Sequence, residues 1–429
     1  MKSERRPNLL ALSPEAIVPP LYGGALRSAN IILGLANVFE TTVLVPQSQP
    51  DIDAAIESNP RLGTVCWKSI WNHSGRRPVS LLKKLRRRLD IRREEQLRRR
   101  WQGIYRDWYF GPLYSWNTIL EQIISETAPD VVLVEHTRHS ASLDMVRRLR
   151  PKALRVVNSQ NVESDLVRQL IANSIPETRR QLIIKELEDY ERALNRRCDV
   201  LWSCSEPDQE RYRELGITRP ASGVVPNGVD TQATPFLAAK PKSQPPRVLF
   251  TGTLCYEPNV NGIFWFHREV WPILKTLVPQ VRWQIIGRAP TQSIMNLAEQ
   301  DPAIDLAADV PAVQPYLEQA DAGICPLFSG SGTRLKILEA FSAGLPMVST
   351  RLGAEGIDAV PGEDILIADN PAEFASAIAR LLQNPSEAER IRQNARSLAV
   401  KLYDWASIAE KAARQLNDLL CQNKSAPQA

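Results

Sequence analysis

The sequence predicts two α/β domains, each built on a parallel β-sheet. Short apolar runs alternate with amphipathic stretches along the 429 residues, and this alternation is typical of strands connected by helices that cover both faces of a sheet. A turn-rich segment and a stretch rich in Pro and Lys interrupt the alternation, which then starts again. We therefore expect an N-terminal domain over residues 1–228, a linker over 229–246 and a C-terminal domain over 247–402.

The N-terminal domain is expected to begin with the strand Asn8–Leu12 and the helix Ala25–Val38, because a short apolar run precedes apolar residues at helical spacing. Its other strands are expected at Thr42–Val45, Val131–Glu135, Leu154–Val157, Val200–Ser203 and Gly223–Val225.

The C-terminal domain repeats this pattern, with a helix from about Asn261 to Leu277 after its first strand. Its strands are expected at Arg247–Phe250, Arg282–Ile286, Ala322–Pro326 and Met347–Ser349. A last helix around Asp404–Leu420 lies beyond the final strand, so the segment 403–429 is expected to cross back to the N-terminal domain.

Composition favours a globular protein of the reducing cytoplasm. Hydrophobic residues make up 43% and charged residues 24% of the chain, which are ordinary proportions for such a protein. The six cysteines are scattered without a CxxC pair, which argues against a disulfide framework or a zinc site. The sequence has no apolar run long enough for a transmembrane helix or a signal peptide. We expect a cytoplasmic protein whose contact with the inner face of a membrane, if any, is peripheral.

Residues 76–101 form a basic segment, which we expect to be a helical insertion. It contains 12 Lys and Arg against 3 Asp and Glu, although the whole chain has a net charge of only +5. Leu81, Leu85 and Leu89 recur at helical spacing. A helix over 80–101 suits an anionic membrane surface or a lipid-phosphate acceptor, and the alternative is a solvated helix whose leucines pack on the domain. It could also contact nucleic acid, although we expect no such partner.

The densest motif begins where the strand Ala322–Pro326 ends. A loop of small residues is followed by a helix from about Arg334 to Ala343, which Gly344 and Pro346 terminate. A loop of this kind before a helix N-terminus presents free backbone N–H groups and the positive end of the helix dipole, which favour phosphate.

The charges in this helix point to the same ligand. Arg334 and Lys336 lie at its start, where cations oppose the helix dipole, and a bound anion would resolve that conflict. Glu339 follows Lys336 at i,i+3 spacing on the same side of the helix. The alternative is an exposed helix with an incidental Lys–Glu pair.

Glycines follow several other predicted strands. Gly23 and Gly24 join the first strand to the first helix, and Gly252 and Gly287 end the first two strands of the C-terminal half. Ligands of open α/β sheets bind beyond the carboxyl ends of the strands, where glycine lets backbone approach a ligand, although tight turns use glycine as well. No complete dinucleotide fingerprint or P-loop is present.

His136 follows the strand Val131–Glu135. A histidine at the end of a strand in a parallel sheet is a candidate acid, base or substrate-binding group. The alternative is an ordinary histidine in a surface loop.

These residues resemble the family 4 retaining glycosyltransferases, which have the GT-B fold. The resemblance rests on Val224–Asp230, Phe250–Gly262 and Gly330–Pro346, and within the family it is greatest to the polysaccharide-associated sugar transferases. It implies two Rossmann-like domains that face each other across a cleft. The N-terminal domain would bind a glycan or lipid-linked acceptor, and the C-terminal domain a nucleotide-diphosphate sugar.

The resemblance also implies roles for single residues. Glu339 would bind the donor ribose, and Arg334 and Lys336 its diphosphate, while His136 would lie near the transferred sugar. The catalytic candidates are His136, Glu339, Arg334 and Lys336. The donor-binding candidates are Gly23, Gly24, Gly252, Gly287, Ser331, Gly332, Thr333, Arg334, Lys336 and Glu339.

The chain departs from the family pattern at four positions. Ser331 replaces a glutamate that usually contacts the sugar, and Gln160 replaces a histidine. Thr253 and Asn261 stand where many members have Arg and Lys. The expected activity is glycosyl transfer with retention, without a cofactor or a metal ion. A nucleotide-sugar epimerase, a phosphorylase and a non-catalytic nucleotide-sugar-binding or scaffold protein are the alternatives.

Overall fold

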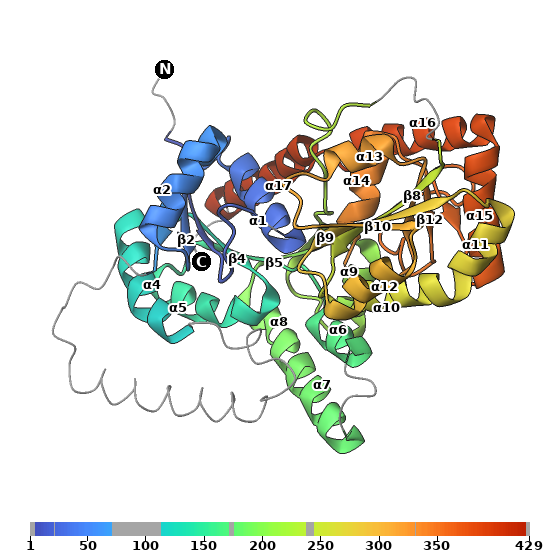
Figure 1. Cartoon of the computed structure of the whole chain (residues 1–429). Coiled ribbons are helices and arrows are strands. Elements are labelled where there is room, and N and C mark those ends of the chain that lie inside the picture. Colours follow the sequence, from blue (N-terminus) through green and yellow to red (C-terminus); the bar gives the residue numbers. More distant parts are fainter. Residues whose placement is uncertain are drawn as a thin grey trace. The chain divides into compact units, whose positions relative to one another are not determined.

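The computed structural model of the chain describes residues 5–20, 22–70, 113–170, 176–236, 244–330 and 332–425. The chain forms two compact units (Figure 1). The first unit comprises Met1–Val225 with Ala409–Ala429, and the second comprises Pro226–Ile408. The predicted basic segment 76–101 lies outside the described residues.

The first unit is built on a seven-stranded parallel sheet with the strand order β3-β2-β1-β4-β5-β6-β7. Its strands are β1 (Asn8–Leu12), β2 (Glu40–Val45), β3 (Cys66–Ser69), β4 (Val131–Glu135), β5 (Leu154–Asn158), β6 (Val200–Ser203) and β7 (Ala221–Val224). Its helices are α1 (Gly23–Leu35), α2 (Gln49–Ser58), α4 (Leu113–Thr127), α5 (Leu143–Leu149), α6 (Glu163–Leu170), α7 (Glu177–Arg192), α8 (Leu194–Arg197) and α9 (Glu206–Glu214), with 3-10 turns η1 (Pro60–Thr64) and η2 (Thr137–Ser142).

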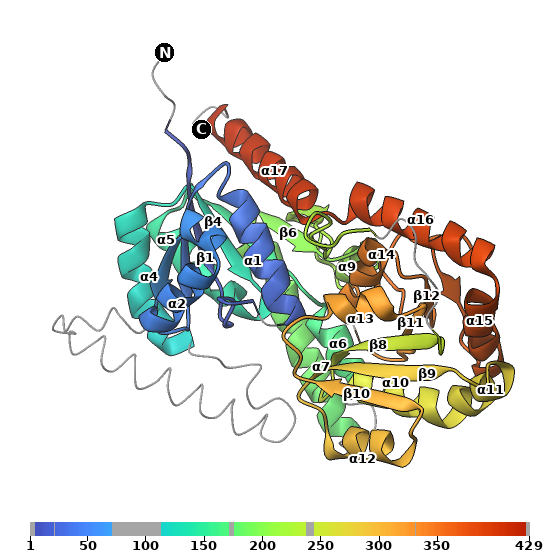
Figure 2. The ribbon, with the colours of Figure 1, turned by 45° about the horizontal axis from the view of Figure 1, so that its top comes forward.

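Helices cover both faces of this sheet. Helices α4 and α5 lie on one face and α1 on the other (Figure 2). Leu10 and Leu12 of β1 belong to the core that includes Leu120 of α4 and Val146 of α5. The strands read as nearly continuous apolar runs because both faces of the sheet are buried.

The second unit has a six-stranded parallel sheet with the order β10-β9-β8-β11-β12-β13. Its strands are β8 (Arg247–Thr253), β9 (Arg282–Arg288), β10 (Ile304–Ala308), β11 (Ala322–Cys325), β12 (Met347–Ser349) and β13 (Leu366–Ile367). Its helices are α10 (Glu257–Trp265), α11 (Trp271–Leu277), α12 (Gln292–Gln300), α13 (Gln314–Gln319), α14 (Leu335–Ala343), α15 (Pro371–Gln383) and α16 (Pro385–Leu402), with a π-helical turn, η3 (Phe266–Val270).

The two sheets share one topology. In each, the chain places its second and third strands outward from the first strand and then returns to place the fourth strand on the other side of the first. This is the Rossmann order, and ligands of such sheets bind at the carboxyl ends of the strands where the order reverses. The topology therefore points to the ends of β1 and β4 in the first unit and of β8 and β11 in the second.

Several sequence predictions need correction. Strands β3, β10 and β13 lie at sheet edges and were not predicted. The helix expected from Asn261 begins at Glu257 and passes through η3 before it continues as α11. Arg334 has an extended backbone and is the N-cap of α14, so it precedes the helix instead of occupying its first turn.

Residues 229–236 of the predicted linker pack within the second unit. Val229 forms a parallel bridge with Asp404, and the hydroxyl of Thr231 donates to Asp404 Oδ2 at 2.6 Å. Arg396 of α16 donates to the carbonyl oxygen of Thr231 at 2.8 Å. Residues 237–243 lie outside the described part of the chain.

The last helix, α17 (Trp405–Ser425), begins in the second unit and continues into the range assigned to the first. Within the first unit, Gln415 accepts a hydrogen bond from the indole of Trp202 at 2.8 Å. Gly34 of α1 lies so close to Ala409 that a Cβ on the glycine would come 2.1 Å from the Ala409 Cβ.

Candidate functional site

Two predicted glycines meet at the carboxyl ends of β8 and β9, next to the reversal point of the second sheet. Gly252 of β8 and Gly287 of β9 are directly paired across the two strands. A Cβ on Gly287 would lie 1.8 Å from the carbonyl oxygen of Gly252, so only glycine fits there. Gly252 has φ +154°, and a Cβ there would lie 3.0 Å from Lys336 Nζ.

Helix α14 begins beside these glycines, after the loop that follows β11. Its first turn contains no acidic residue, and Gly344 ends it in the left-handed conformation with φ 72°, as the sequence predicted. The Ile337 N–H of its first turn donates to the Arg334 carbonyl oxygen at 3.0 Å, and the N–H groups before it in the helix are available to an anion.

Lys336 extends from this first turn over the end of β8. Its ammonium lies 3.9 Å from the centroid of the Phe250 ring and donates to Asn259 Oδ1 at 2.9 Å. Burial lowers the pKa of Lys336 to about 8, and the positive charge of Arg334 also lowers it, while Cys325 and Glu339 oppose the shift. A partly buried cation that forms no ion pair with a described carboxylate favours an anionic ligand.

Glu339 lies one turn further along α14. Burial raises the pKa of its carboxyl group to about 7, although Lys336 opposes the shift. No hydrogen bond joins this carboxyl group to another residue in the described ranges. It is therefore placed to accept hydrogen bonds from a ligand hydroxyl.

The loop before α14 adds Gly332, Thr333 and Arg334. The Arg334 guanidinium donates to the carbonyl oxygen of Gly332. Asn227, from the Pro-Asn-Gly turn, donates to the carbonyl oxygen of Thr333 at 3.1 Å. The buried hydroxyl of Thr333 has no hydrogen-bond partner among the described residues. Ser331 lies outside them.

The first unit carries a buried polar network at its own reversal point. Glu135, at the end of β4, accepts from Ser28 Oγ at 2.7 Å and from Asn158 Nδ2 at 3.1 Å. Arg27 donates to Asn158 Oδ1 at 2.7 Å. Gln160 donates to Ser28 Oγ at 2.9 Å. The network fixes the start of α1 against the ends of β4 and β5.

Gly23 and Gly24 form the first turn of α1. A Cβ on Gly24 would lie 2.4 Å from Gln160 Oε1. The glycine therefore makes room for the end of the Gln160 side chain, in addition to the ligand approach that the sequence suggested.

His136 follows Glu135 with a strained backbone at φ 66°. Its Nε2 lies 3.3 Å from Glu15 Oε1, and its buried Nδ1 has no hydrogen-bond partner in the described part of the chain. Burial lowers the pKa of His136, while Glu163 and Glu135 oppose the shift. The imidazole is therefore neutral near pH 7 and can accept a proton or a hydrogen bond.

The structure thus sorts the predicted residues into two groups. The first group lies at or next to the reversal point of the second unit and comprises Gly252, Gly287, Gly332, Thr333, Arg334, Lys336 and Glu339. Gly23, Gly24 and His136 lie at that of the first unit. Sequence reasoning missed Asn259, Asn227 and Glu15, because single polar residues in loops and at helix starts carry no distinctive pattern.

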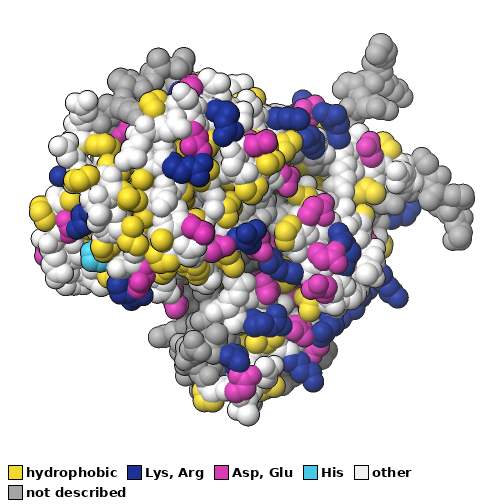
Figure 3. All heavy atoms as spheres, turned by 90° about the vertical axis from the view of Figure 1, so that its right-hand side faces the viewer, with side chains coloured by type: hydrophobic (Ala, Val, Ile, Leu, Met, Phe, Trp, Pro, Cys, Tyr) yellow, Lys and Arg dark blue, Asp and Glu magenta, His cyan; other side chains and the backbone are white. Residues whose placement is uncertain are grey.

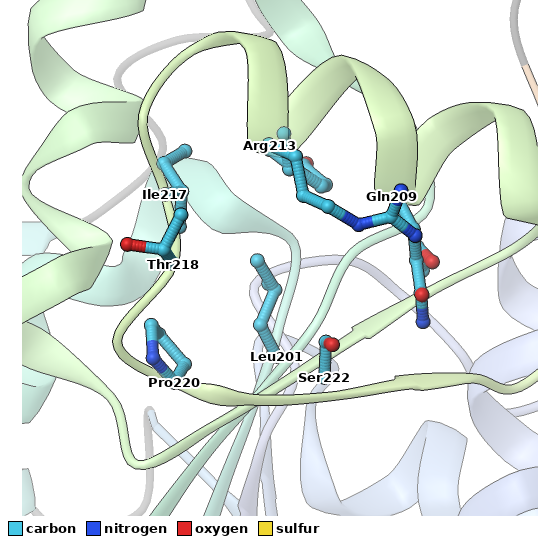
Figure 4. A pocket seen from close by; sticks show the side chains of 9 residues that line it. Leu201, Gln209, Arg213, Ile217, Thr218, Pro220 and Ser222 are labelled. Atoms are coloured by element: carbon cyan, nitrogen blue, oxygen red, sulfur yellow. The ribbon is translucent and has the colours of Figure 1, made fainter.

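Other features lie apart from these groups. A cavity of about 130 Å³ lies between α9 and strands β6 and β7 and is lined by Leu201, Gln209, Tyr212 and Ile217 among others (Figure 4). None of the six cysteines, all of which lie within the described residues, forms a disulfide, and no cluster of metal-binding side chains occurs in the same part of the chain. On the face shown in Figure 3, Lys and Arg are interspersed with Asp and Glu.

Comparison with known families settles what kind of protein carries these two groups. Residues 23–233 match the family described as Glycosyltransferase Family 4, and residues 245–384 match the one described as Glycosyl transferases group 1. The chain belongs to glycosyltransferase family 4. This glycosyltransferase has the two-domain GT-B fold, as the solved structures below confirm.

The solved structures cover nearly the whole glycosyltransferase. The sucrose-phosphate synthase of Thermosynechococcus elongatus matches 97% of this chain and 100% of its own, with a TM-score of 0.70 and 14% identity. Anabaena HepE in complex with UDP matches 96% of this chain and 100% of its own, with a TM-score of 0.65 and 14% identity. At these identities the likeness establishes the fold.

The curated relatives are matched over part of their length. The glycogen synthase of Mycobacterium tuberculosis is 26% identical over 240 residues, which are 54% of this chain and 56% of the relative. An uncharacterized protein in the cps region of Klebsiella pneumoniae is 30% identical over 37% of this chain and 42% of its own. The glycosyltransferase therefore spans about half the length of the curated relatives it matches. None of its described helices is long and apolar enough to cross a membrane.

Proposed function

We propose that this glycosyltransferase transfers a hexosyl group from a nucleoside-diphosphate sugar to a glycan or lipid-linked acceptor, with retention at the anomeric carbon. The observation that carries the proposal is the site at the reversal point of the second unit. There the half-buried Lys336 lies beside Gly252 at the start of a helix, and the charges of Arg334 and Glu339 act on it. This combination fits a diphosphate and the diol of a ribose.

The donor diphosphate is the leaving group of the reaction. Negative charge grows on it while the bond to the anomeric carbon breaks, and positive charge grows on the sugar. Arg334, Lys336 and the first N–H groups of α14 would stabilise the diphosphate oxygens in the transition state. Because these groups supply positive charge directly, the proposal needs no metal ion.

The acceptor would bind to the first unit, near His136. A neutral imidazole can accept a hydrogen bond from the acceptor hydroxyl or from a sugar hydroxyl of the donor. The strained backbone of His136 supports a functional role, because such strain persists only where the surrounding structure holds it. Retention rests on the family and is part of the proposal.

UDP-glucose is the first donor to test. The solved structures of Anabaena HepE include complexes with UDP and with UDP-glucose. A thermal-shift screen of the full chain against UDP, GDP, ADP and CMP would identify the nucleotide. A ligand at about 100 times its dissociation constant adds about 2.7 kcal/mol of stability.

Glycosyl transfer is then measured with a nucleotide sugar that carries the preferred nucleotide, and with glycan and lipid-linked acceptors. NMR of the product determines its anomeric configuration. We expect Glu339→Ala to abolish transfer while the fold is kept. A folded protein that gives no shift with any nucleotide would contradict the proposal. Nucleotide binding without transfer to any acceptor, with biological output unchanged in Glu339→Ala, would favour a non-catalytic role.

A further inference from the structure

Asn259 connects Lys336 to the end of strand β8 through both ends of its side-chain amide. Its Nδ2 donates to the carbonyl oxygen of Thr253 at 2.8 Å, and its Oδ1 accepts from Lys336 Nζ at 2.9 Å. The residue is only 5% exposed. Because the Thr253 carbonyl can only accept, it determines which end of the amide faces the ammonium group.

The hydrogen bond to Asn259 leaves most of the binding capacity of Lys336 unused. An ammonium group has three N–H donors. Within the described residues, Lys336 makes this one hydrogen bond, and no carboxylate oxygen lies within ion-pair distance of its Nζ. The remaining donors are therefore available to a ligand.

The surroundings restrict the ammonium group on its other sides. The Phe250 ring lies 3.9 Å from Nζ and contributes a cation–π interaction. Gly252 lies so near that a Cβ on it would come 2.9 Å from Asn259 Nδ2 and 3.0 Å from Nζ. The missing side chain of Gly252 thus makes room for the amide and the ammonium together.

We propose that Asn259 is a positioning residue that holds the Lys336 ammonium toward the donor diphosphate without neutralising its charge. This inference rests on the proposed function, in which Lys336 binds the diphosphate. A neutral acceptor is required for the role, because a carboxylate would pair with the ammonium and compete with the phosphate oxygens. The amide also satisfies the Thr253 carbonyl, which a carboxylate would repel.

The substitution Asn259→Asp tests this role because it keeps the size of the side chain and adds a charge. Calorimetric titration of the full chain with UDP should show weakening of about tenfold or more, because the added carboxylate pairs with the ammonium and repels the diphosphate. The control Asn296→Asp makes the same change on the exposed side of α12 and should leave the dissociation constant unchanged.

The pH profile separates positioning from a merely structural role. Wild-type affinity should fall as Lys336 loses its proton, with Cys325, Arg334 and Glu339 as the other titratable groups that act on it. In Asn259→Asp, the added carboxylate favours the ammonium form, so the fall should move to higher pH. In Asn259→Ala, UDP binding should weaken by a few fold because Lys336 loses the hydrogen bond that positions its ammonium group.

The outcomes are distinguishable. If the wild type binds UDP and Asn259→Asp binds it with the same affinity and the same pH profile, the role of Asn259 is overturned. The proposed function is then unaffected. A folded wild type that binds none of UDP, GDP or ADP would overturn the proposed function, and the role of Asn259 with it. Failure of both Asn259 variants to fold would show a structural residue and would also overturn the inference.

Discussion

Glu15 Oε1 lies 3.3 Å from Nε2 of His136, so the loop after β1 is joined to the strained residue after β4. The other carboxylate oxygen of Glu15 accepts from the hydroxyl of Tyr22 at 2.5 Å, immediately before the glycines that begin α1. The guanidinium of Arg138 pairs with the same carboxylate. One carboxylate therefore holds both loops at the reversal point of the first unit.

The substitution Glu15→Gln should lower the rate of glycosyl transfer without changing UDP affinity. The amide keeps the size of the side chain but loses the charge that holds Arg138 and His136, and a misplaced acid–base group costs about 10²-fold or less in rate. Steady-state kinetics and UDP titration measure the two quantities separately. Glu57→Gln on the exposed side of α2 is the control, and equal kcat values for both variants would contradict the expectation.

UDP affinity should fall as the pH rises through about 8. The charged ammonium of Lys336 is the form that binds a diphosphate, burial lowers its pKa to about 8, and raising the pH above that value removes the charge. Affinity should decrease by up to about tenfold per pH unit above the pKa. Titrations from pH 7 to pH 9.5 check this.

The control for this pH dependence is Lys336→Met. The variant should bind UDP weakly at every pH and show no fall above pH 8, because it has no ammonium to lose. A wild-type affinity that stays constant to pH 9.5 would exclude Lys336 as the group that titrates.

Most of the strands predicted from sequence are buried on both faces, and the edge strand β7, which is half exposed, is the exception. The strand predicted at Val131–Glu135, an apolar run of four residues followed by a glutamate, matches β4 residue for residue. Strand β10 lies at a sheet edge, contains Asp305 and is only partly buried, so its sequence lacks that run. Strand β13 has two residues, too few for any periodicity.

The candidate site was predictable to the same partial degree. The motif around Lys336 and Gly252 each follow a predicted strand. Because ligands of parallel sheets bind at the carboxyl ends of the strands, the sequence predicted that both contribute to one site. The partners of these residues were not predictable. Asn259 and Glu15 act through distances of about 3 Å to residues far away in sequence, and an ordinary polar side chain gives no sign of such a contact.

The close pairing of Gly252 and Gly287 predicts a large cost for a side chain. Gly287→Ala places a Cβ 1.8 Å from the Gly252 carbonyl oxygen, so the strands must separate, and the free energy of unfolding should fall by about 1–3 kcal/mol or more. Urea denaturation measures the change. The control Gly63→Ala meets its nearest atom, Ile56 Cγ2, at 3.7 Å and should change stability by about 0.5 kcal/mol or less.

A buried acid in the first unit should make stability depend on pH. Glu191 of α7 accepts from the Glu163 backbone N–H at 2.8 Å and from Ser164 Oγ at 2.5 Å, which caps the start of α6. Burial raises the pKa of Glu191 to about 8. Between its unfolded value near 4.5 and pH 8 the folded state keeps a proton that the unfolded state releases, so stability should fall as the pH rises.

The size of this effect is limited to one proton, or about 1.4 kcal/mol per pH unit. Urea denaturation at pH 5.5 and pH 8 should therefore show a loss in the wild type that is smaller in Glu191→Gln, whose amide cannot ionise. Gln181→Glu on the exposed side of the same helix adds a carboxyl group in water and should keep the wild-type difference. If Glu191→Gln loses as much stability between pH 5.5 and pH 8 as the wild type, another group is responsible for the loss. Glu191 is then ionised in the folded protein, because the two hydrogen bonds that it accepts lower its pKa by more than burial raises it.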